Sequence, residues 1–248
     1  MRRAAALLAA GALALAGCGG GDDVLTVSAA SSLKTALTDY GADFDEARAR
    51  FSFAGSDELA AQLRRGARPD VFASANTKLP DELYDEGLVE KPVTFAGNRL
   101  VLAVPAGSNA AIASLRDVER PGTNLAIGAE SVPVGSYTRA VLAKLPESES
   151  SAILSNVRSA EPDVAGIVGK LTQGAVNAGF VYATDVAAAG DALRAVQLPA
   201  RLRPTVVYEA AVVRGTKHPD QAKAFVDGLG AGLGQDALRK AGFLPLPQ

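Results

Sequence analysis

Serines early in the chain stand where donors for an anion could gather. An apolar run at 24–27 predicts a strand, and Ser31 or Ser32 then stands at the expected start of a helix over residues 33–44. Ser56 repeats this arrangement after a second predicted strand. The first amides of a helix have no partner inside it, and the helix dipole is positive there. An oxyanion is therefore one candidate ligand, although helix capping alone also accounts for each serine.

The elements that must position these serines alternate between strand and helix. Apolar segments predict strands at 51–53, 70–75, 100–104, 125–128, 179–185 and 206–213, and helical patterns fall between most of them. Such alternation favours a parallel sheet and an α/β fold, in which ligands bind beyond the carboxyl ends of the strands. The serine turns fall on that edge. The strands at 100–104 and 206–213 are expected to cross between two lobes.

The second half of the chain contains further candidate donors. Pro133 and Gly135 force an unusual turn that leaves amides near Val134 free to point at a ligand. Asp163 is expected to cap the following helix, and a later strand ends in Tyr182. The glycine-rich run at 228–234 follows a helix, so we expect a flexible connection there and no phosphate-binding loop.

The amino terminus has the pattern of a secretion signal. A basic start precedes a short apolar run at 4–15, and residues 15–18 read Leu-Ala-Gly-Cys, which resembles the lipobox of bacterial lipoproteins. This pattern predicts a signal peptide at 1–17, a lipidated Cys18 and a flexible tether at 18–23. An ordinary signal peptide with an incidental Cys18 is the alternative.

Composition argues against several classes of function. The 248-residue chain has a net charge of −2, or −4 once the two arginines of the predicted signal are removed, and this mild acidity does not favour nucleic acid. Cys18 and His218 are the only residues of their types, so the sequence has no His/Cys cluster for a metal. No Gly-x-Ser-x-Gly motif is present, which disfavours a serine hydrolase. We therefore expect a protein that is not an enzyme.

Seven motifs together resemble the molybdate-binding proteins of bacterial molybdate ABC transporters. They are Ala-Ala-Ser-Ser-Leu at 29–33, Phe-Ala-Gly-Ser at 53–56, Pro-Asp-Val-Phe-Ala-Ser-Ala at 69–75, Gly-Asn-Arg-Leu-Val at 97–101, Val-Pro-Val-Gly-Ser-Tyr at 132–137, Glu-Pro-Asp-Val at 161–164 and Gly-Phe-Val-Tyr-Ala-Thr-Asp at 179–185. They follow the family's order along nearly all of the predicted mature chain.

This resemblance implies an overall organisation. It implies a two-lobed periplasmic binding protein of type II, in which each lobe is a mixed sheet flanked by helices and the ligand cleft lies between them. The first lobe would comprise 24–100 and 207–248, and the second 101–206. The protein would be a monomer outside the cytoplasm, anchored to the membrane through lipid on Cys18, that passes molybdate or tungstate to an ABC permease.

The resemblance also implies a ligand site without a cofactor and without direct metal coordination. Ser32 and Ser56 would each give a hydroxyl and a backbone amide, Val134 and Val164 would give amides, and Tyr182 would give its phenol hydroxyl. The sequence departs from some relatives in two places, and in the first of these Gly55 stands where a serine is common. Two acidic residues, Asp57 and Glu58, also follow Ser56 directly and would weaken anion binding unless they point to solvent.

Donor groups alone suit a ligand that can only accept hydrogen bonds. Molybdate and tungstate are tetrahedral dianions without a proton at neutral pH, whereas phosphate keeps a proton that would need an acceptor. Sulfate differs from molybdate mainly in size, so a sulfate-binding protein of the same fold is the main alternative. A ferric-ion-binding protein and a scaffold lipoprotein without a small ligand are two others.

Overall fold

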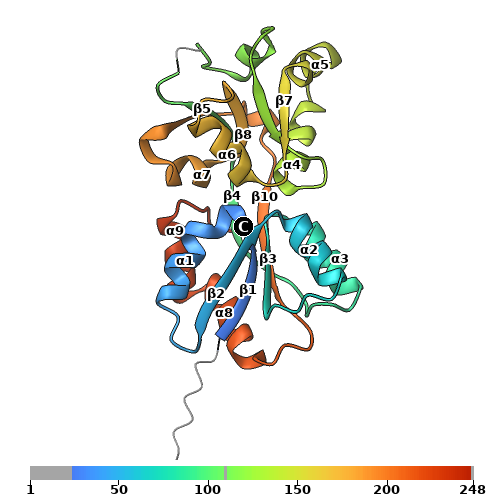
Figure 1. The fold of residues 1–248 in the computed structure, drawn as a ribbon, viewed down its shortest axis with the longest axis vertical. Helices are drawn as coiled ribbons and strands as arrows, with labels where there is room; N and C mark the ends of the chain where they lie inside the picture. Colours follow the sequence, from blue (N-terminus) through green and yellow to red (C-terminus); the bar gives the residue numbers. More distant parts are fainter. Residues whose placement is uncertain (1–23, 109–110, 247–248) are drawn as a thin grey trace, which may run out of the picture.

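The structure, a computed structural model, describes residues 24–108 and 111–246. The predicted signal peptide, Cys18 and the tether lie outside these residues. The described chain forms two lobes, one above the other along the long axis of the molecule (Figure 1). In the described residues, no helix is both long enough and apolar enough to cross a membrane.

The first lobe contains a five-stranded mixed sheet in the order β2-β1-β3-β10-β4. β1 runs parallel to β2 and β3, whereas β10 runs antiparallel to β3 and β4. Its strands are β1 (Val24–Ala30), β2 (Arg48–Ala54), β3 (Val71–Ser74), β4 (Val93–Asn98) and β10 (Val206–Val212). Its helices are η1 (Ser31–Leu33), α1 (Lys34–Ala42), α2 (Ser56–Arg64), α3 (Lys78–Asp85), α8 (Pro219–Gly230) and α9 (Gly232–Lys240).

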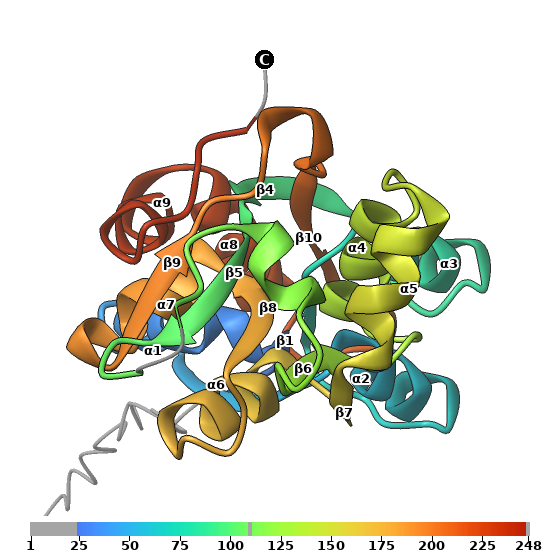
Figure 2. The ribbon, with the colours of Figure 1, turned by 90° about the horizontal axis from the view of Figure 1, so that it is seen from above.

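The second lobe repeats this plan in the order β7-β6-β8-β5-β9. β6 runs parallel to β7 and β8, and β5 runs antiparallel to β8 and β9. Its strands are β5 (Leu100–Pro105), β6 (Leu125–Gly128), β7 (Val157–Glu161), β8 (Ala178–Tyr182) and β9 (Leu193–Val196). Around them lie α4 (Pro133–Leu142), α5 (Glu147–Ser155), α6 (Val164–Thr172), α7 (Ala183–Ala188) and three short helices, η2 (Leu115–Glu119), η3 (Gly190–Ala192) and η4 (Ala200–Leu202) (Figure 2). The predicted fold class of two mixed sheets flanked by helices is confirmed.

The chain passes between the lobes in short links, and the prediction of two long crossing strands is wrong. β4 ends at Asn98 and β5 begins at Leu100, so Arg99 is the link between the two sheets. β10 pairs with β3 and β4 and so belongs to the first sheet, while β5 pairs only within the second. An apolar strand is stabilised by full pairing inside one sheet, which explains why neither strand spans both lobes.

The glycine-rich run at 228–234 forms the end of α8 and the start of α9, with Ala231 alone between the two helices, so the prediction of a flexible connection is wrong. A methyl group added at Gly228 would come within 2.0 Å of the Tyr40 hydroxyl, and one at Gly234 within 2.4 Å of the Gly228 carbonyl oxygen. The Tyr40 ring lies 4.6 Å from the ring of Phe225 on α8, measured between centroids. These glycines therefore allow α1, α8 and α9 to pack closely.

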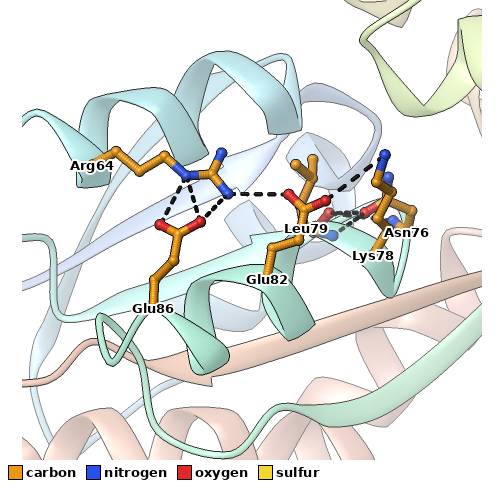
Figure 3. A network of polar contacts seen from close by, with 7 residues as sticks. Arg64, Asn76, Lys78, Leu79, Glu82 and Glu86 are labelled. Atoms are coloured by element: carbon orange, nitrogen blue, oxygen red, sulfur yellow. Dashed lines mark hydrogen bonds and ion pairs between the residues drawn. The ribbon is translucent and has the colours of Figure 1, made fainter.

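Ion pairs join α2 to α3 (Figure 3), and these two helices lie together at one side of the first lobe (Figure 1). Arg64 Nη2 lies 2.7 Å from Glu86 Oε1 and 3.0 Å from Glu82 Oε2, and Lys78 Nζ lies 3.7 Å from Glu82 Oε1. Exposed pairs of this kind contribute about 0–1 kcal/mol each. They help to hold α2 in place, and Ser56 lies at the other end of this helix.

Candidate ligand-binding site

A small cavity lies between the two lobes and is lined by the start of several helices. Its volume is about 20 Å³. A single water-sized sphere needs about 10–15 Å³ by the same measure, so the cavity suits a compact ligand. The lining residues are Ala30, Ser31, Ser32, Ala54, Gly55, Ser56 and Ala75 from the first lobe and Val132, Pro133, Val134, Asp163, Val164 and Tyr182 from the second. The structure thus brings together all five residues predicted to bind the ligand.

Four helical segments begin at this cavity, two from each lobe. Helical structure starts at Ser31, Ser56, Pro133 and Val164, and each of these residues lines the cavity. The first amides of a helix have no acceptor within it, and the positive end of its dipole lies there. Four such ends make the cavity a site for a negatively charged ligand.

The hydroxyls of the two serines do not cap their helices, so the capping interpretation is wrong. The residues that precede the helical segments are Ala30 and Gly55, and neither helix start has a side-chain cap. Ser32 Oγ lies 2.9 Å from the Tyr208 hydroxyl, and Ser56 Oγ accepts a 3.2 Å hydrogen bond from the Ala75 amide. Because Ser56 Oγ is an acceptor there, its own hydrogen remains to be donated.

Tyr182 brings a buried hydroxyl to the cavity. It is the last residue of β8, its side chain is 1% exposed, and its hydroxyl has no hydrogen-bond partner within the described residues. Burial raises the pKa of this hydroxyl well above its ordinary value, so it remains a donor at neutral pH. An unpaired buried polar group costs stability, and a ligand that accepts from it would remove that cost.

The charged side chains near the cavity are placed so that they repel a bound anion little. In the described part of the chain, no lysine or arginine lines the cavity, and its one acidic lining residue is Asp163. The Asp163 carboxylate accepts a 2.8 Å hydrogen bond from the Gly166 amide, which confirms its predicted capping role. Asp57 and Glu58 are not among the lining residues: Asp57 Oδ2 accepts from Ser131 Oγ at 2.6 Å, and the exposed Glu58 accepts from Gln62.

Neither a metal-binding cluster nor a serine–histidine pair is found at the cavity among the residues that the structure describes. Within the described residues, no cluster of three or more His, Cys, Asp or Glu side chains could hold a metal ion. His218 precedes α8 and is not among the lining residues, so it is not paired with Ser32 or Ser56.

Sequence reasoning missed several residues around the site. Ser131 bonds to Asp57 from the opposite lobe, and Tyr208 contacts Ser32 through its hydroxyl. Tyr208 lies on β10 in an apolar strand pattern that is typical of core residues, so the sequence gives no signal for this polar contact. Ser131 precedes the turn at Pro133, and this position in the sequence could have marked it as a residue near the cavity.

A small cavity lined by hydrogen-bond donors between two α/β lobes defines a two-lobed solute-binding protein. The chain matches the family of bacterial extracellular solute-binding proteins over residues 25–244 and belongs to that family. Membership indicates a binding role and a location outside the cytoplasm.

Individual relatives are similar over most of their length. The molybdate-binding protein ModA of Mycobacterium tuberculosis is 36% identical over 224 residues, which cover 88% of this chain and 84% of that protein. The periplasmic molybdate-binding protein of Azotobacter vinelandii has the same fold, with a TM-score of 0.78, 22% identity and coverage of 90% of this chain and 100% of that chain. The sulfate-binding protein SubI of M. tuberculosis also shares the fold, with a TM-score of 0.79, 16% identity and coverage of 90% and 87%. The predicted resemblance to molybdate-binding proteins is confirmed.

Proposed function

We propose that this chain binds molybdate in the cavity between its lobes and delivers it to the permease of an ABC transporter. The ligand would accept hydrogen bonds from the hydroxyls of Ser32, Ser56 and Tyr182 and from the amides of Val134 and Val164. The 36% identity to a molybdate-binding protein supports this choice of ligand.

The observation that carries the proposal is the donor set of the cavity. Four helix starts and the unpaired Tyr182 hydroxyl meet at a cavity of about 20 Å³, and its lining within the described residues includes no lysine or arginine. A tetrahedral dianion without a proton can accept from every one of these groups. A hydrogen bond to a charged group contributes about 1.5–3 kcal/mol, so a handful of them accounts for submicromolar binding even after ordering and desolvation costs.

Selectivity among oxyanions would follow from hydrogen-bond chemistry and size. Tungstate has the charge and shape of molybdate, so we propose that it also binds. Phosphate at neutral pH carries a proton that would face donors, which costs affinity. Sulfate is smaller than molybdate and would leave longer contacts to the same donors.

A calorimetric titration of the purified protein with molybdate, tungstate, sulfate and phosphate tests the proposal. We expect submicromolar binding of molybdate and tungstate, much weaker binding of sulfate and no measurable binding of phosphate. Tighter binding of sulfate than of molybdate would establish the alternative function, and no heat with any of the four would contradict an oxyanion-binding role.

We also propose that the protein is a monomer held at the membrane by lipid on Cys18. For the lobes we propose the expected division into 24–100 with 207–248 and 101–206, except that Leu100 pairs in the second sheet and Val206 in the first, so each boundary moves by one residue. Replacement of Cys18 by serine should release the protein from the membrane fraction in cells that otherwise retain it. Light scattering after gel filtration should give the mass of one chain with and without molybdate. Retention of the Cys18→Ser protein in the membrane would contradict the anchor.

A further inference from the structure

A chain of buried polar groups lies directly behind Ser32. The Asn98 side-chain nitrogen lies 3.3 Å from the Tyr208 hydroxyl, which lies 2.9 Å from Ser32 Oγ. Asn98, Tyr208 and Ser32 are 4%, 0% and 8% exposed, respectively. Asn98 is the last residue of β4, beside the link between the sheets, and Tyr208 is on β10 (Figure 1).

The hydrogen-bond partners of Oδ1 and Nδ2 fix the orientation of the Asn98 side chain. Its Oδ1 accepts a 2.8 Å hydrogen bond from the Arg99 amide, so this end must be the oxygen. Its Nδ2 therefore faces Thr184 Oγ1 at 2.9 Å and the Tyr208 hydroxyl at 3.3 Å. Both of these oxygens then accept from Asn98.

The direction of the remaining hydrogen bonds follows from this orientation. The Tyr208 oxygen accepts from Asn98, so the single hydrogen of Tyr208 is available to Ser32 Oγ. Burial, with a contribution from the Asp185 carboxylate, raises the pKa of the Tyr208 hydroxyl well above its ordinary value, so that hydrogen is present at neutral pH. Donation of that hydrogen to Ser32 Oγ gives it a partner, and the hydrogen of Ser32 is then left to point at the cavity that Ser32 lines.

We propose that Asn98 and Tyr208 are positioning residues that commit the Ser32 hydroxyl to donate to the bound oxyanion. The inference rests on the proposed function and deepens it, because it explains how a serine, which can either donate or accept, is restricted to donation. A buried network of this kind acts as a unit, so its direction can be reversed from its far end.

Replacement of Asn98 by aspartate would reverse the chain. An aspartate at this position accepts from Tyr208, so the Tyr208 oxygen would turn to accept from Ser32. Ser32 would then present a lone pair to the dianion. Loss of a hydrogen bond to a charged ligand corresponds to about 10- to 150-fold in affinity, and we expect Asn98→Asp to weaken molybdate binding by at least that much.

Replacement of Tyr208 by phenylalanine would break the chain without reversing it. Ser32 could still donate but would no longer be held in place, so we expect a loss of about 2- to 10-fold, the range for one neutral hydrogen bond. In the double variant, the introduced aspartate could no longer act on Ser32 through the Tyr208 hydroxyl. The double variant should therefore bind molybdate more tightly than Asn98→Asp alone.

The experiment is a set of molybdate titrations of the wild type, Ser32→Ala, Asn98→Asp, Tyr208→Phe and the double variant. Tyr40→Phe is the matched control, because its buried hydroxyl donates to the Phe225 carbonyl away from the cavity. Circular dichroism and melting temperature establish that each variant is folded. If Asn98→Asp does not fold, Asn98→Ala replaces it, because this change removes the donor without adding charge. We expect Asn98→Ala to bind molybdate about 2- to 10-fold more weakly than the wild type.

The outcomes separate this inference from the proposed function. If the wild type does not bind molybdate, the proposed function fails. If the wild type binds and Ser32→Ala weakens binding, but Tyr208→Phe and the folded Asn98 variant bind as the wild type does, the positioning role is overturned. A double variant that binds more weakly than Asn98→Asp would also overturn it, because the charge of the introduced aspartate would then act directly on the ligand.

Discussion

The hydroxyl of Ser131 donates a 2.6 Å hydrogen bond to Asp57 Oδ2 and so joins the second lobe to the first beside the ligand cavity. Ser131 precedes α4, and Asp57 lies in the first turn of α2, so the bond links the starts of two helices that face the same cavity. A contact between lobes exists only when they are closed together. It therefore favours the closed state over an open one.

Loss of this contact should weaken ligand binding by favouring the open state. We expect Ser131→Ala to weaken molybdate binding about 2- to 10-fold, less than the loss of a buried hydrogen bond to a charged group because this bond is exposed to solvent, and mainly through faster dissociation. Stopped-flow release of molybdate would measure it. Ser155→Ala is a suitable control because the Ser155 hydroxyl donates to the Ala152 carbonyl on its own helix. Equal release rates in the two variants would show that the bond does not hold the lobes together.

Tyr182→Phe should lower the affinity for molybdate without lowering the stability of the ligand-free protein. The Tyr182 hydroxyl is buried without a partner in the described structure, so its removal takes away a group that costs stability in the free protein. We expect an unchanged or higher melting temperature without ligand, together with a loss of molybdate affinity of about tenfold or more. Calorimetry and thermal melting measure the two effects. A lower melting temperature with unchanged affinity would mean that the hydroxyl serves the fold and not the ligand.

The strand-and-turn pattern of the sequence accounts for most of the cavity. Ser56 and Val134 could be placed because each stands in the first turn of a helix, next to small residues or proline that end the preceding segment, whereas the role of Val164 came from the family resemblance. The capping interpretation failed for the serines, since the true N-cap positions, Ala30 and Gly55, lie one or two residues earlier than the pattern indicates.

Other features had no distinctive pattern in the sequence. Tyr208 stands in a mostly apolar strand like many core residues, and its polar contact joins segments that are distant in the chain. A glycine-rich run can be flexible or can allow close helix packing, and only the position of Tyr40 against Gly228 decides between these. α5 has a polar sequence with a single buried residue, Ile153, so its helical period is weak.

Gly55→Ala should hinder closure of the lobes. A methyl group at Gly55 would come within 2.4 Å of the Pro162 carbonyl oxygen from the opposite lobe. The Gly55 backbone angles, φ −60° and ψ 137°, suit alanine, and within the first lobe the methyl group would come within 2.8 Å of Asp57 Oδ1, a side-chain atom that can shift. We expect roughly tenfold weaker molybdate binding as the closed state becomes less populated.

The matched control for this change is Gly230→Ala, because a methyl group there would contact nothing within 4 Å. Small-angle scattering with saturating molybdate would report closure directly. A Gly55→Ala protein that closes and binds like the control would show that the turn at Pro162 yields to the methyl group.

Asp185 should make the stability of the protein depend on pH. Its side chain is half-buried and accepts a hydrogen bond from the Tyr182 amide, and desolvation of the carboxyl, more than the nearby Asp163 charge, raises its pKa from 3.8 to about 7. Between these two values the folded state binds a proton that the unfolded state has released, so the free energy of unfolding falls as pH rises from about 4 to 7. A tenfold difference in proton affinity between the two states corresponds to about 1.4 kcal/mol.

Asp185→Asn should remove this dependence, because asparagine can still accept from the Tyr182 amide but does not ionise. Urea unfolding at pH 5 and pH 8 would measure it, with Glu147→Gln, a change at an exposed carboxylate on α5, as the control. We expect the variant to lose less stability than the wild type between the two pH values, by a few kcal/mol, and the control to follow the wild type. If the variant and the wild type lose the same amount of stability between pH 5 and pH 8, Asp185 is ionised in the folded protein throughout this range. The carboxylate beside Tyr182 would then add a negative charge next to the ligand cavity at every pH tested.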